Sequence, residues 1–443
     1  MIKYILKVLP FWTVMCVLAA CSSSEDNHGE KDPDILPKAE TTVIIYMAAE
    51  NNLSGTASDN LSTIANASKT GNLSNNYLVA FVDKMSALPY VASFKDGVDK
   101  KSALPYVASF KDGKETRDSH YTCNEDFISA DPEKMYETLA WIQTRYPANN
   151  YALILWGHCS GWLTENDTIA TSQQKSTLQQ AYGIDYGTDN AAPKSIWINI
   201  PTLANTLNRL KKFKYIIADC CNFQCVEVAY ELRHCCEYTI GSPAEMPSKG
   251  VPYAKLVPLL FDTTEQNMQS IADGIFNQTI EGKHIPVSVI KTSELPALAN
   301  KTQELVNMLY EENKEPSVSK VIHYFSDGTA TGRTMYDMKD MFYTNLYTDA
   351  ATAYQQWLQA YDNTVIYQKI DYDNPEWITD PWGPNINFYV MNIQPEKFGG
   401  CSMFFPLKRY DSASSSYARN YNRNILKLQW PHAIGLEKYC TPQ

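Results

Sequence analysis

Two short segments place reactive side chains directly after a run of strand-forming residues. Asp219 and Cys221 follow the apolar run 215–218, and His158 follows the run 151–156. Open α/β sheets carry their reactive groups at the carboxyl ends of parallel strands, so neighbouring strands would bring His158 and Cys221 together. A thiol beside an imidazole is the arrangement that nucleophilic cysteine catalysis requires. Such a pair is common in a chain of this size, and a packed, inert thiol is the other interpretation.

The elements that would position these residues alternate between strands and helices. Six short apolar runs are typical of buried strands: 42–47, 77–83, 151–156, 215–219, 237–242 and 287–290. Helical patterns lie between them, for example at 132–146, where Asp131 is the expected N-cap, and at 200–213. This alternation predicts an α/β core at 41–315, with a mostly parallel sheet flanked by helices. After residue 315 the sequence no longer shows this alternation of strands and helices, and we expect residues 316–443 to form an α+β subdomain packed on that core.

The N-terminus has the features of a targeting segment. Residues 1–20 combine two lysines with an apolar run, as a signal peptide does. The sequence Leu18-Ala19-Ala20-Cys21 resembles the lipobox of bacterial lipoproteins, in which the cysteine carries the lipid. We therefore expect a monomer in the bacterial cell envelope, on the periplasmic side or the cell surface, lipid-anchored through Cys21 and a polar tether at 21–40. An ordinary signal peptide and a membrane anchor remain the alternatives.

The net charge and the cysteine content limit which other functions the sequence allows. The 443 residues carry a formal net charge of −11, which argues against nucleic-acid binding through bulk electrostatics. Eleven cysteines are present, and one group could hold a metal or form a disulfide, although it contains no repeated Cys-x2-Cys motif. The group consists of Cys220, Cys221, Cys225, His234, Cys235 and Cys236.

A tandem duplication interrupts the first half of the chain. Residues 82–97 are repeated as 98–113, and Lys101 in place of Met85 is the only difference. Two copies do not make a solenoid. We interpret the duplication as one strand-and-turn unit present twice, so that one copy extends a hairpin or loops out.

Several motifs together resemble the clostripain family of cysteine peptidases, which has a caspase-like fold. The resemblance spans about 41–435 and rests on an ordered set of segments. These are Val43–Leu53, Trp156-Gly157-His158-Cys159-Ser160-Gly161-Trp162, Asp219-Cys220-Cys221, Ser242–Pro247 and Gly400–Pro406.

The resemblance implies a role for each matching residue. His158 is the expected general base and Cys221 the nucleophile, because the family's cysteine lies two residues after the aspartate. Asp219 would select Arg or Lys before the scissile bond, with Glu245 as a second acid in that pocket. The backbone N–H groups of Cys159 and Cys221 would form the oxyanion hole. Cys159 replaces a glycine that is usual in the family, and Cys220 replaces a small residue.

The resemblance also implies synthesis as a zymogen that cleaves itself between the histidine and the nucleophile. The long connection 163–197 lies there, and Lys175 and Lys194 are the candidate cleavage sites. Some members of the family use calcium, but the sequence shows no ligand set, so we expect no cofactor from the residues themselves. The resulting hypothesis is an endopeptidase that cuts protein or peptide substrates after Arg or Lys. The alternative is a non-catalytic envelope lipoprotein that keeps the fold as a binding module.

Overall fold

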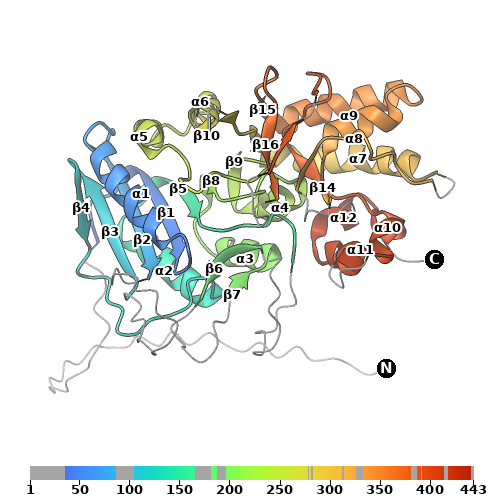
Figure 1. Cartoon of the computed structure of the whole chain (residues 1–443). Helices are drawn as coiled ribbons and strands as arrows, with labels where there is room; N and C mark the ends of the chain where they lie inside the picture. Colours follow the sequence, from blue (N-terminus) through green and yellow to red (C-terminus); the bar gives the residue numbers. More distant parts are fainter. Residues whose placement is uncertain are drawn as a thin grey trace, which may run out of the picture. The chain divides into compact units, whose positions relative to one another are not determined.

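A large β-sheet organises the chain (Figure 1). The computed structural model describes residues 35–85, 104–164, 181–186, 196–277, 279–280, 283–311, 314–325, 333–380, 387–390, 392–413 and 418–440. Within these residues the sheet has nine strands, in the order β15-β12-β9-β8-β5-β1-β2-β3-β4. Their bounds are β1 Ala39–Ala49, β2 Asn76–Lys84, β3 Tyr106–Lys111, β4 Lys114–Arg117, β5 Ala148–Trp156, β8 Phe213–Asp219, β9 Cys236–Gly241, β12 Val287–Lys291 and β15 Val365–Lys369.

The five central strands are parallel and the two edges are antiparallel. β2, β1, β5, β8 and β9 run in one direction. At one edge β12 pairs antiparallel with β9 and β15 pairs antiparallel with β12, and at the other edge β3 and β4 form an antiparallel extension. The mostly parallel α/β sheet predicted from the sequence is confirmed. The carboxyl ends of all five parallel strands therefore lie on the same side of the sheet, and the turns that follow the strands lie there too.

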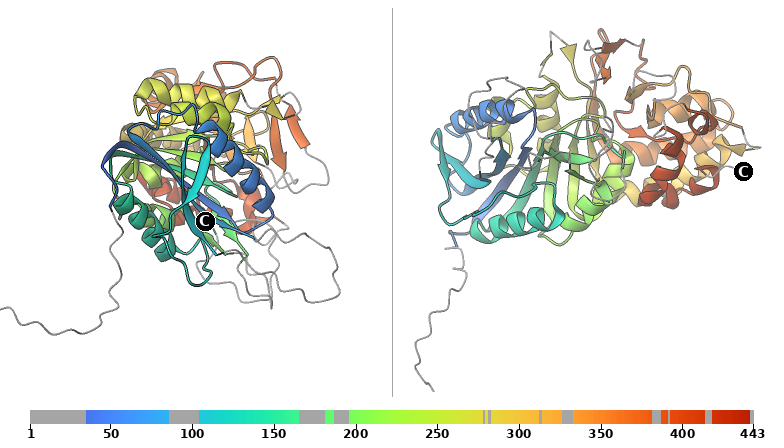
Figure 2. Two further views of the ribbon diagram at one scale, coloured as in Figure 1. Left: turned by 90° about the vertical axis from the view of Figure 1, so that its left-hand side faces the viewer. Right: turned by 60° about the horizontal axis from the view of Figure 1, so that its bottom comes forward.

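Helices cover both faces of the sheet, and strand residues alternate between the two resulting cores. In β1, for example, Ile44 and Tyr46 pack into one core and Val43 and Ile45 into the other, as the two-residue period of a strand requires. The first core includes helices α2 Pro132–Arg145, α3 Ile200–Leu207 and α4 Val226–Glu231. The second includes α1 Ser54–Ala67, α5 Tyr253–Leu256 and α6 Glu265–Phe276. Figure 2 shows α1 and α2 on opposite sides of the sheet.

The local signals explain where some helices begin and end. The Asp131 side chain accepts hydrogen bonds from the N–H groups of Glu133 and Lys134, both at 2.9 Å, so it is the predicted N-cap of α2. Helix α3 is shorter than the predicted 200–213, because the chain turns at 208–209 and Phe213 already begins β8.

The C-terminal part of the chain contributes to the central sheet as well as to its own elements. Strand β15 belongs to the nine-stranded sheet, and residues 33–443 form one compact unit. Helix α7 Leu295–Leu309 precedes this region. The region itself contains the helices α8 Met338–Leu346 and α9 Ala351–Thr364, a small sheet of β13 His323–Phe325, β14 Met335–Asp337 and β18 Ser402–Met403, and a hairpin of β16 Glu376–Asp380 and β17 Asn387–Val390. Four short helices follow: α10 Lys408–Asp411, α11 Tyr421–Asn424, α12 Gln429–Ala433 and α13 Glu437–Cys440. The region after 315 is thus joined to the core by strand pairing.

The two copies of the duplication are used differently. The start of the first copy, 82–84, completes β2, and the second copy supplies β3 and the turn into β4. Most of the first copy lies in 86–103, outside the described residues.

The connection 163–197 contains two short strands that the sequence did not indicate. β6 Tyr182–Asp185 pairs antiparallel with β7 Ile196–Ile198, and the rest of this connection lies largely outside the described residues. Among the described helices, none combines the length and the apolar composition that crossing a lipid bilayer requires.

Candidate active site

His158 is held by a neighbour from a different strand. It is half-buried, two residues beyond the end of β5, and its Nε2 atom lies 2.8 Å from Oδ1 of Asn52, in the turn after β1. An amide oxygen only accepts hydrogen bonds, so Nε2 donates and Nδ1 keeps its electron pair. Burial lowers the pKa of His158 to about 4. The ring is therefore neutral at pH 7 and able to accept a proton.

Cys221 lies two residues beyond the end of β8, in a tight turn. The next residue, Asn222, has a left-handed φ of 54°, which asparagine tolerates better than most residues. The Cys221 Sγ atom accepts a hydrogen bond from the N–H of Met246 at 3.3 Å. Burial, and then the charge of Glu245, raises the pKa of the Cys221 thiol well above its ordinary value. In this conformation the sulfur is a protonated thiol that needs a base.

His158 and Cys221 emerge at the same level of the sheet. β5 and β8 are parallel neighbours in which Trp156 pairs with Asp219, and each side chain lies two residues beyond that pair. Within the described part of the chain no hydrogen bond joins the imidazole to the thiol, since Nε2 contacts Asn52 and Sγ contacts Met246. The fold thus brings the two strand ends to the same level of adjacent strands, and each side chain has another partner in this conformation.

The turns that carry the two residues pack directly on each other. Gly161, three residues after His158, has φ 61°, and a Cβ atom there would lie 2.7 Å from the carbonyl oxygen of Asn222. Glycine alone meets both the conformation and the close approach.

The two unusual cysteines have their side chains in the core. Cys159 is 7% and Cys220 is 1% exposed. Burial, and then interaction with the Cys159 thiol, raises the pKa of Cys220 well above its ordinary value. The backbone N–H groups of Cys159 and Cys221 donate to no backbone carbonyl among the described residues. Because the side chains of Cys159 and Cys220 are buried, neither of them takes up space at the surface of the site.

The Asp219 carboxylate is already engaged by a loop of the same chain. It is 4% exposed, and it accepts hydrogen bonds from the N–H of Val251 and the hydroxyl of Tyr253, both at 2.8 Å. Gly250, with φ 71°, lets this loop approach, because a Cβ there would lie 2.6 Å from Asp219 Oδ1. Burial raises the pKa of Asp219 to about 7. A substrate cation could reach this carboxylate only after the loop 250–253 moves.

Glu245 lies beside the thiol. Its Oε1 atom accepts a hydrogen bond from Asn222 Nδ2 at 2.7 Å, and its charge contributes to the raised pKa of Cys221. In this conformation Glu245 therefore stabilises the turn around Cys221 and opposes formation of the thiolate.

The late segment 400–406 packs directly behind the Cys221 turn. The N–H of Ser402 donates to the carbonyl of Gln224 at 3.0 Å, and the N–H of Phe404 donates to Oε1 of the buried Glu227 at 2.7 Å. Burial raises the pKa of Glu227 to about 7. The segment at 400–406 and the segment at 219–227 are thus in contact, although almost 180 residues separate them.

Other residues proposed from the sequence are not assembled into a site or are not described. The cysteines that the structure describes are all free thiols, and its one cluster of three or more metal-ligand side chains is acidic, so the group from Cys220 to Cys236 is not gathered around one point. Cys21, Lys175 and Lys194 lie outside the described residues.

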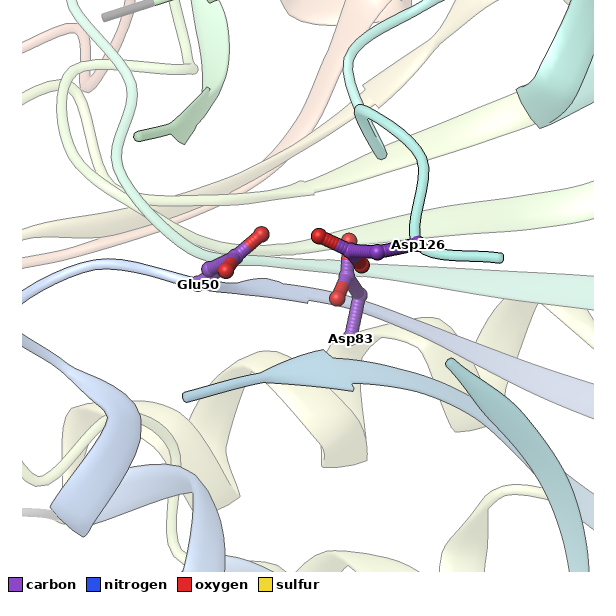
Figure 3. Close-up of side chains that lie close together, drawn as sticks. All are labelled: Glu50, Asp83 and Asp126. Atoms are coloured by element: carbon purple, nitrogen blue, oxygen red, sulfur yellow. The ribbon is translucent and has the colours of Figure 1, made fainter. Parts of the chain in front are cut away.

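Two features of the site were missed in the sequence. Asn52 belongs to a polar turn after the first strand, and its position at a strand end was the available signal. A cluster of Glu50, Asp83 and Asp126 lies near the same edge of the sheet (Figure 3). Its members come from three separate segments, and no spacing in the sequence connects them.

These observations define an α/β protein with a histidine and a cysteine at the ends of adjacent parallel strands. The sequence model of the clostripain family matches residues 45–434, which is most of the chain. The chain therefore belongs to the clostripain family of cysteine peptidases, and the family resemblance predicted from the motifs is confirmed. Family membership makes it a hydrolase whose substrates are proteins or peptides.

Solved structures support the same fold. A secreted C11 cysteine protease from Bacteroides thetaiotaomicron, in complex with an irreversible peptide inhibitor, is 24% identical, with a TM-score of 0.68 over 90% of this chain and 100% of that one. An inactive zymogen C11 protease from Parabacteroides distasonis is 24% identical, with a TM-score of 0.67 over 90% and 99%. No curated protein is similar enough to this chain to count as a match.

Proposed function

We propose that this protein is a cysteine endopeptidase that cleaves after Arg or Lys, with Cys221 as nucleophile and His158 as general base. The observation that carries the proposal is the placement of His158 and Cys221 at the same level of adjacent strands, with Asn52 holding the imidazole. A neutral His158 would take the thiol proton as Cys221 attacks the scissile carbonyl. The N–H groups of Cys159 and Cys221 would then stabilise the oxyanion.

The same geometry supports a latent precursor. The Cys221 thiol has a raised pKa and the loop 250–253 occupies Asp219, so neither the nucleophile nor the acid is ready for substrate. We infer that self-cleavage within 163–197, after Lys175 or Lys194, allows the rearrangement that frees Asp219. The carboxylate, released inside a poorly solvated pocket, would then select a basic side chain strongly.

One experiment separates an active peptidase from a non-catalytic binding module. Fluorogenic peptides with Arg, Lys or Ala before the scissile bond are given to wild-type, Cys221→Ala and Cys220→Ala proteins. We expect basic-selective hydrolysis in wild type and Cys220→Ala, and neither hydrolysis nor self-cleavage in Cys221→Ala. Processed wild-type protein that hydrolyses none of the peptides would instead support the binding module.

Specificity is tested at the loop that covers Asp219. Tyr253→Phe removes one hydrogen bond to the carboxylate but leaves its charge, so the preference for Arg and Lys over Ala should be kept. Asp219→Asn removes the charge, and kcat/KM for basic peptides should fall about 100-fold or more. Equal loss in both variants would show that Asp219 acts only by holding the loop.

We also infer that Cys21 carries a lipid that anchors the protein in the cell envelope. The proposal rests on the lipobox-like sequence Leu18–Cys21 and the polar segment that follows. Mass spectrometry of the mature N-terminus should find diacylglyceryl-modified Cys21, and an unmodified Cys21 would exclude the anchor.

A further inference from the structure

Two buried thiols lie next to each other behind the candidate active site. Cys159 directly follows His158 and Cys220 directly precedes Cys221, and both are free thiols that are 7% and 1% exposed. The Cys220 thiol forms a side-chain hydrogen bond with the Cys159 thiol. The pair therefore connects the turn that carries the imidazole to the turn that carries the nucleophile.

The alternation of side chains along the chain directs Cys220 away from the nucleophile. Ala218 and Cys220 belong to the core that also contains Cys159, whereas Cys221 packs against the core on the other face of the sheet. Successive residues of an extended chain point to opposite faces, which explains this separation. The thiols of Cys159 and Cys220 thus share one core, from which the reacting sulfur is excluded.

The position of Cys159 is fixed by the strand that follows it. Cys159 lies opposite Tyr182 of β6 in an antiparallel bridge, with backbone hydrogen bonds of 3.0 and 2.9 Å on either side. Side chains of directly opposite residues lie on the same face of an antiparallel pair. The Cys159 side chain therefore points in the same direction as the Tyr182 ring.

The Tyr182 ring extends from Cys159 to the end of β5, beside Cys220. Its hydroxyl donates to the carbonyl of Trp156 at 3.2 Å, and Trp156 is the register partner of Asp219, the residue before Cys220. Burial, and then the nearby thiols of Cys220 and Cys159, raises the pKa of Tyr182 well above its ordinary value. The strand register and the phenol thus place both thiols at the same point of the core.

We propose that Cys159 and Cys220 form a disulfide bond that joins the turn of His158 covalently to the turn of Cys221. The bond brings the two sulfur atoms to about 2.05 Å. Disulfides persist in oxidising compartments outside the cytosol, so the bond in the cell rests on the proposed location in the envelope. The partner of Cys220 is then a cysteine from a different strand end, and not one of the cysteines at 225–236.

The bond forms by exchange with an oxidant that itself carries a disulfide. Cys159, the more exposed of the two residues, attacks as a thiolate one sulfur of that disulfide and releases the other sulfur as a thiol. Cys220 then loses its proton, attacks the Cys159 sulfur and releases the second thiol. The protein gives up two protons and two electrons, and the oxidant becomes two thiols. Burial slows both attacks in the folded protein, so the bond should form fastest while the chain folds.

The disulfide has a direct consequence for a chain that is cut between its two cysteines. It closes the segment 159–220, which contains the whole connection 163–197. A break in that connection therefore leaves the part with His158 and the part with Cys221 covalently joined. This consequence rests on the proposed self-cleavage, whereas formation of the bond does not. Closing so long a loop also restricts the unfolded chain, which stabilises the folded state.

The test uses full-length Cys221→Ala protein, which can neither cleave itself nor form a bond through residue 221. One sample is folded with oxidised and reduced glutathione, and a second is kept in dithiothreitol. We expect mass spectrometry of the oxidised sample to find a linked pair of peptides that contain residues 159 and 220. The oxidised sample should also have two fewer thiols that react with iodoacetamide after denaturation, and a Tm higher by a few degrees.

A gel experiment tests the covalent connection itself. A recognition site for a sequence-specific protease is introduced in the connection 163–197 of the Cys221→Ala protein, and the protease is added after oxidative folding. The cut protein should run as one band on a non-reducing denaturing gel and as two bands after reduction. Wild-type protein that cleaves itself should show the same behaviour.

Variants decide which cysteines are responsible. Cys220→Ala and Cys159→Ala should each lose the linked peptides, the difference in Tm and the joined fragments. They change different turns, so the second remains informative if the first fails to fold. Cys235→Ala is the matched control, because Cys235 is also a buried thiol and its Sγ atom donates to the carbonyl of Ala204 at 3.3 Å. This control should keep the disulfide.

Three results would overturn the proposal. The first is that residues 159 and 220 are still free thiols after oxidative folding, and the second is that Cys220 is linked to a different cysteine. The third is that the cut fragments remain joined in Cys220→Ala, which would place the bond elsewhere. None of these readouts requires peptide hydrolysis or self-cleavage, so failure of this proposal is distinguishable from failure of the proposed function.

Discussion

The Nε2 atom of His158 lies 2.8 Å from Oδ1 of Asn52, which joins the end of β5 to the turn after β1. This contact fixes the tautomer that leaves Nδ1 able to accept a proton. Asn52→Ala should therefore lower kcat about 100-fold with little change in KM, because a misplaced base costs that much in rate. Asn52→Asp keeps an acceptor oxygen and adds a charge, so it should restore much of the rate and raise the pKa of the acidic limb of the pH profile. Equal loss in both variants, or a fall in Tm that accounts for the loss, would contradict a positioning role.

The protonation state of Cys221 gives a second prediction. Burial and Glu245 hold the thiol pKa well above its ordinary value, so alkylation of Cys221 by iodoacetamide should be slow at pH 7 and still rising at pH 9. Glu245→Gln removes the adjacent charge, so the curve of alkylation rate against pH should move to lower pH. Mass spectrometry of the peptide containing residue 221 measures the rate. A plateau already at pH 6–7 in the unprocessed protein would show that the sulfur is a thiolate stabilised by His158.

The buried Glu227 makes folding stability depend on pH. Its pKa is raised from 4.5 to about 7, so between these values the folded state binds more protons than the unfolded state. The stabilisation is complete below pH 4.5, falls as the pH rises from 4.5 to 7, and is absent above about pH 7. Glu227→Gln keeps an acceptor for the N–H of Phe404 and removes the titration. Part of the loss has already occurred at pH 6, so denaturant unfolding at pH 6 and pH 8.5 should show a smaller difference in the variant, by roughly 1 kcal/mol.

Removal of residues 98–113 should leave a folded protein. The first copy then continues directly into Lys114, and its Tyr90–Lys95 has the same sequence as β3. The shortened chain keeps Asp83 and can form the same hairpin with a shorter connection. We expect soluble protein with a Tm within a few degrees of the parent and unchanged peptide cleavage. Loss of soluble protein would show that the extra residues are required.

Local sequence patterns predicted the elements of the fold better than their directions. The apolar runs at 151–156 and 215–219 coincide with β5 and β8, and Asp131 caps α2, because these signals are contained in a few neighbouring residues. Strand β12 pairs antiparallel with both β9 and β15, and no local pattern contains the direction of a strand.

The residues of the candidate site were also predictable only where the signal is local in the sequence. His158 and Cys221 were identifiable because each follows its own strand. The contact between Asn52 and His158, by contrast, joins residues 106 positions apart, and the occupation of Asp219 by Val251 and Tyr253 depends on the fold of a distant loop. Long-range contacts of this kind depend on the order of strands in the sheet, and local patterns in the sequence do not show that order.

The duplicated segment has a consequence for how the chain folds. β2 can pair with either of two identical stretches, Tyr90–Lys95 or Tyr106–Lys111, and the shorter connection to the first favours it by about 1 kcal/mol in closure entropy. The folded protein uses the second, which places Asp118 where it binds Arg145 and Tyr146 at 2.9 and 2.6 Å. Closure entropy alone would therefore favour pairing with the first copy, whereas the contacts of Asp118 with α2 and its C-cap favour pairing with the second. A chain with a single copy has no such competition, so we expect the full chain to refold more slowly than the chain that lacks residues 98–113.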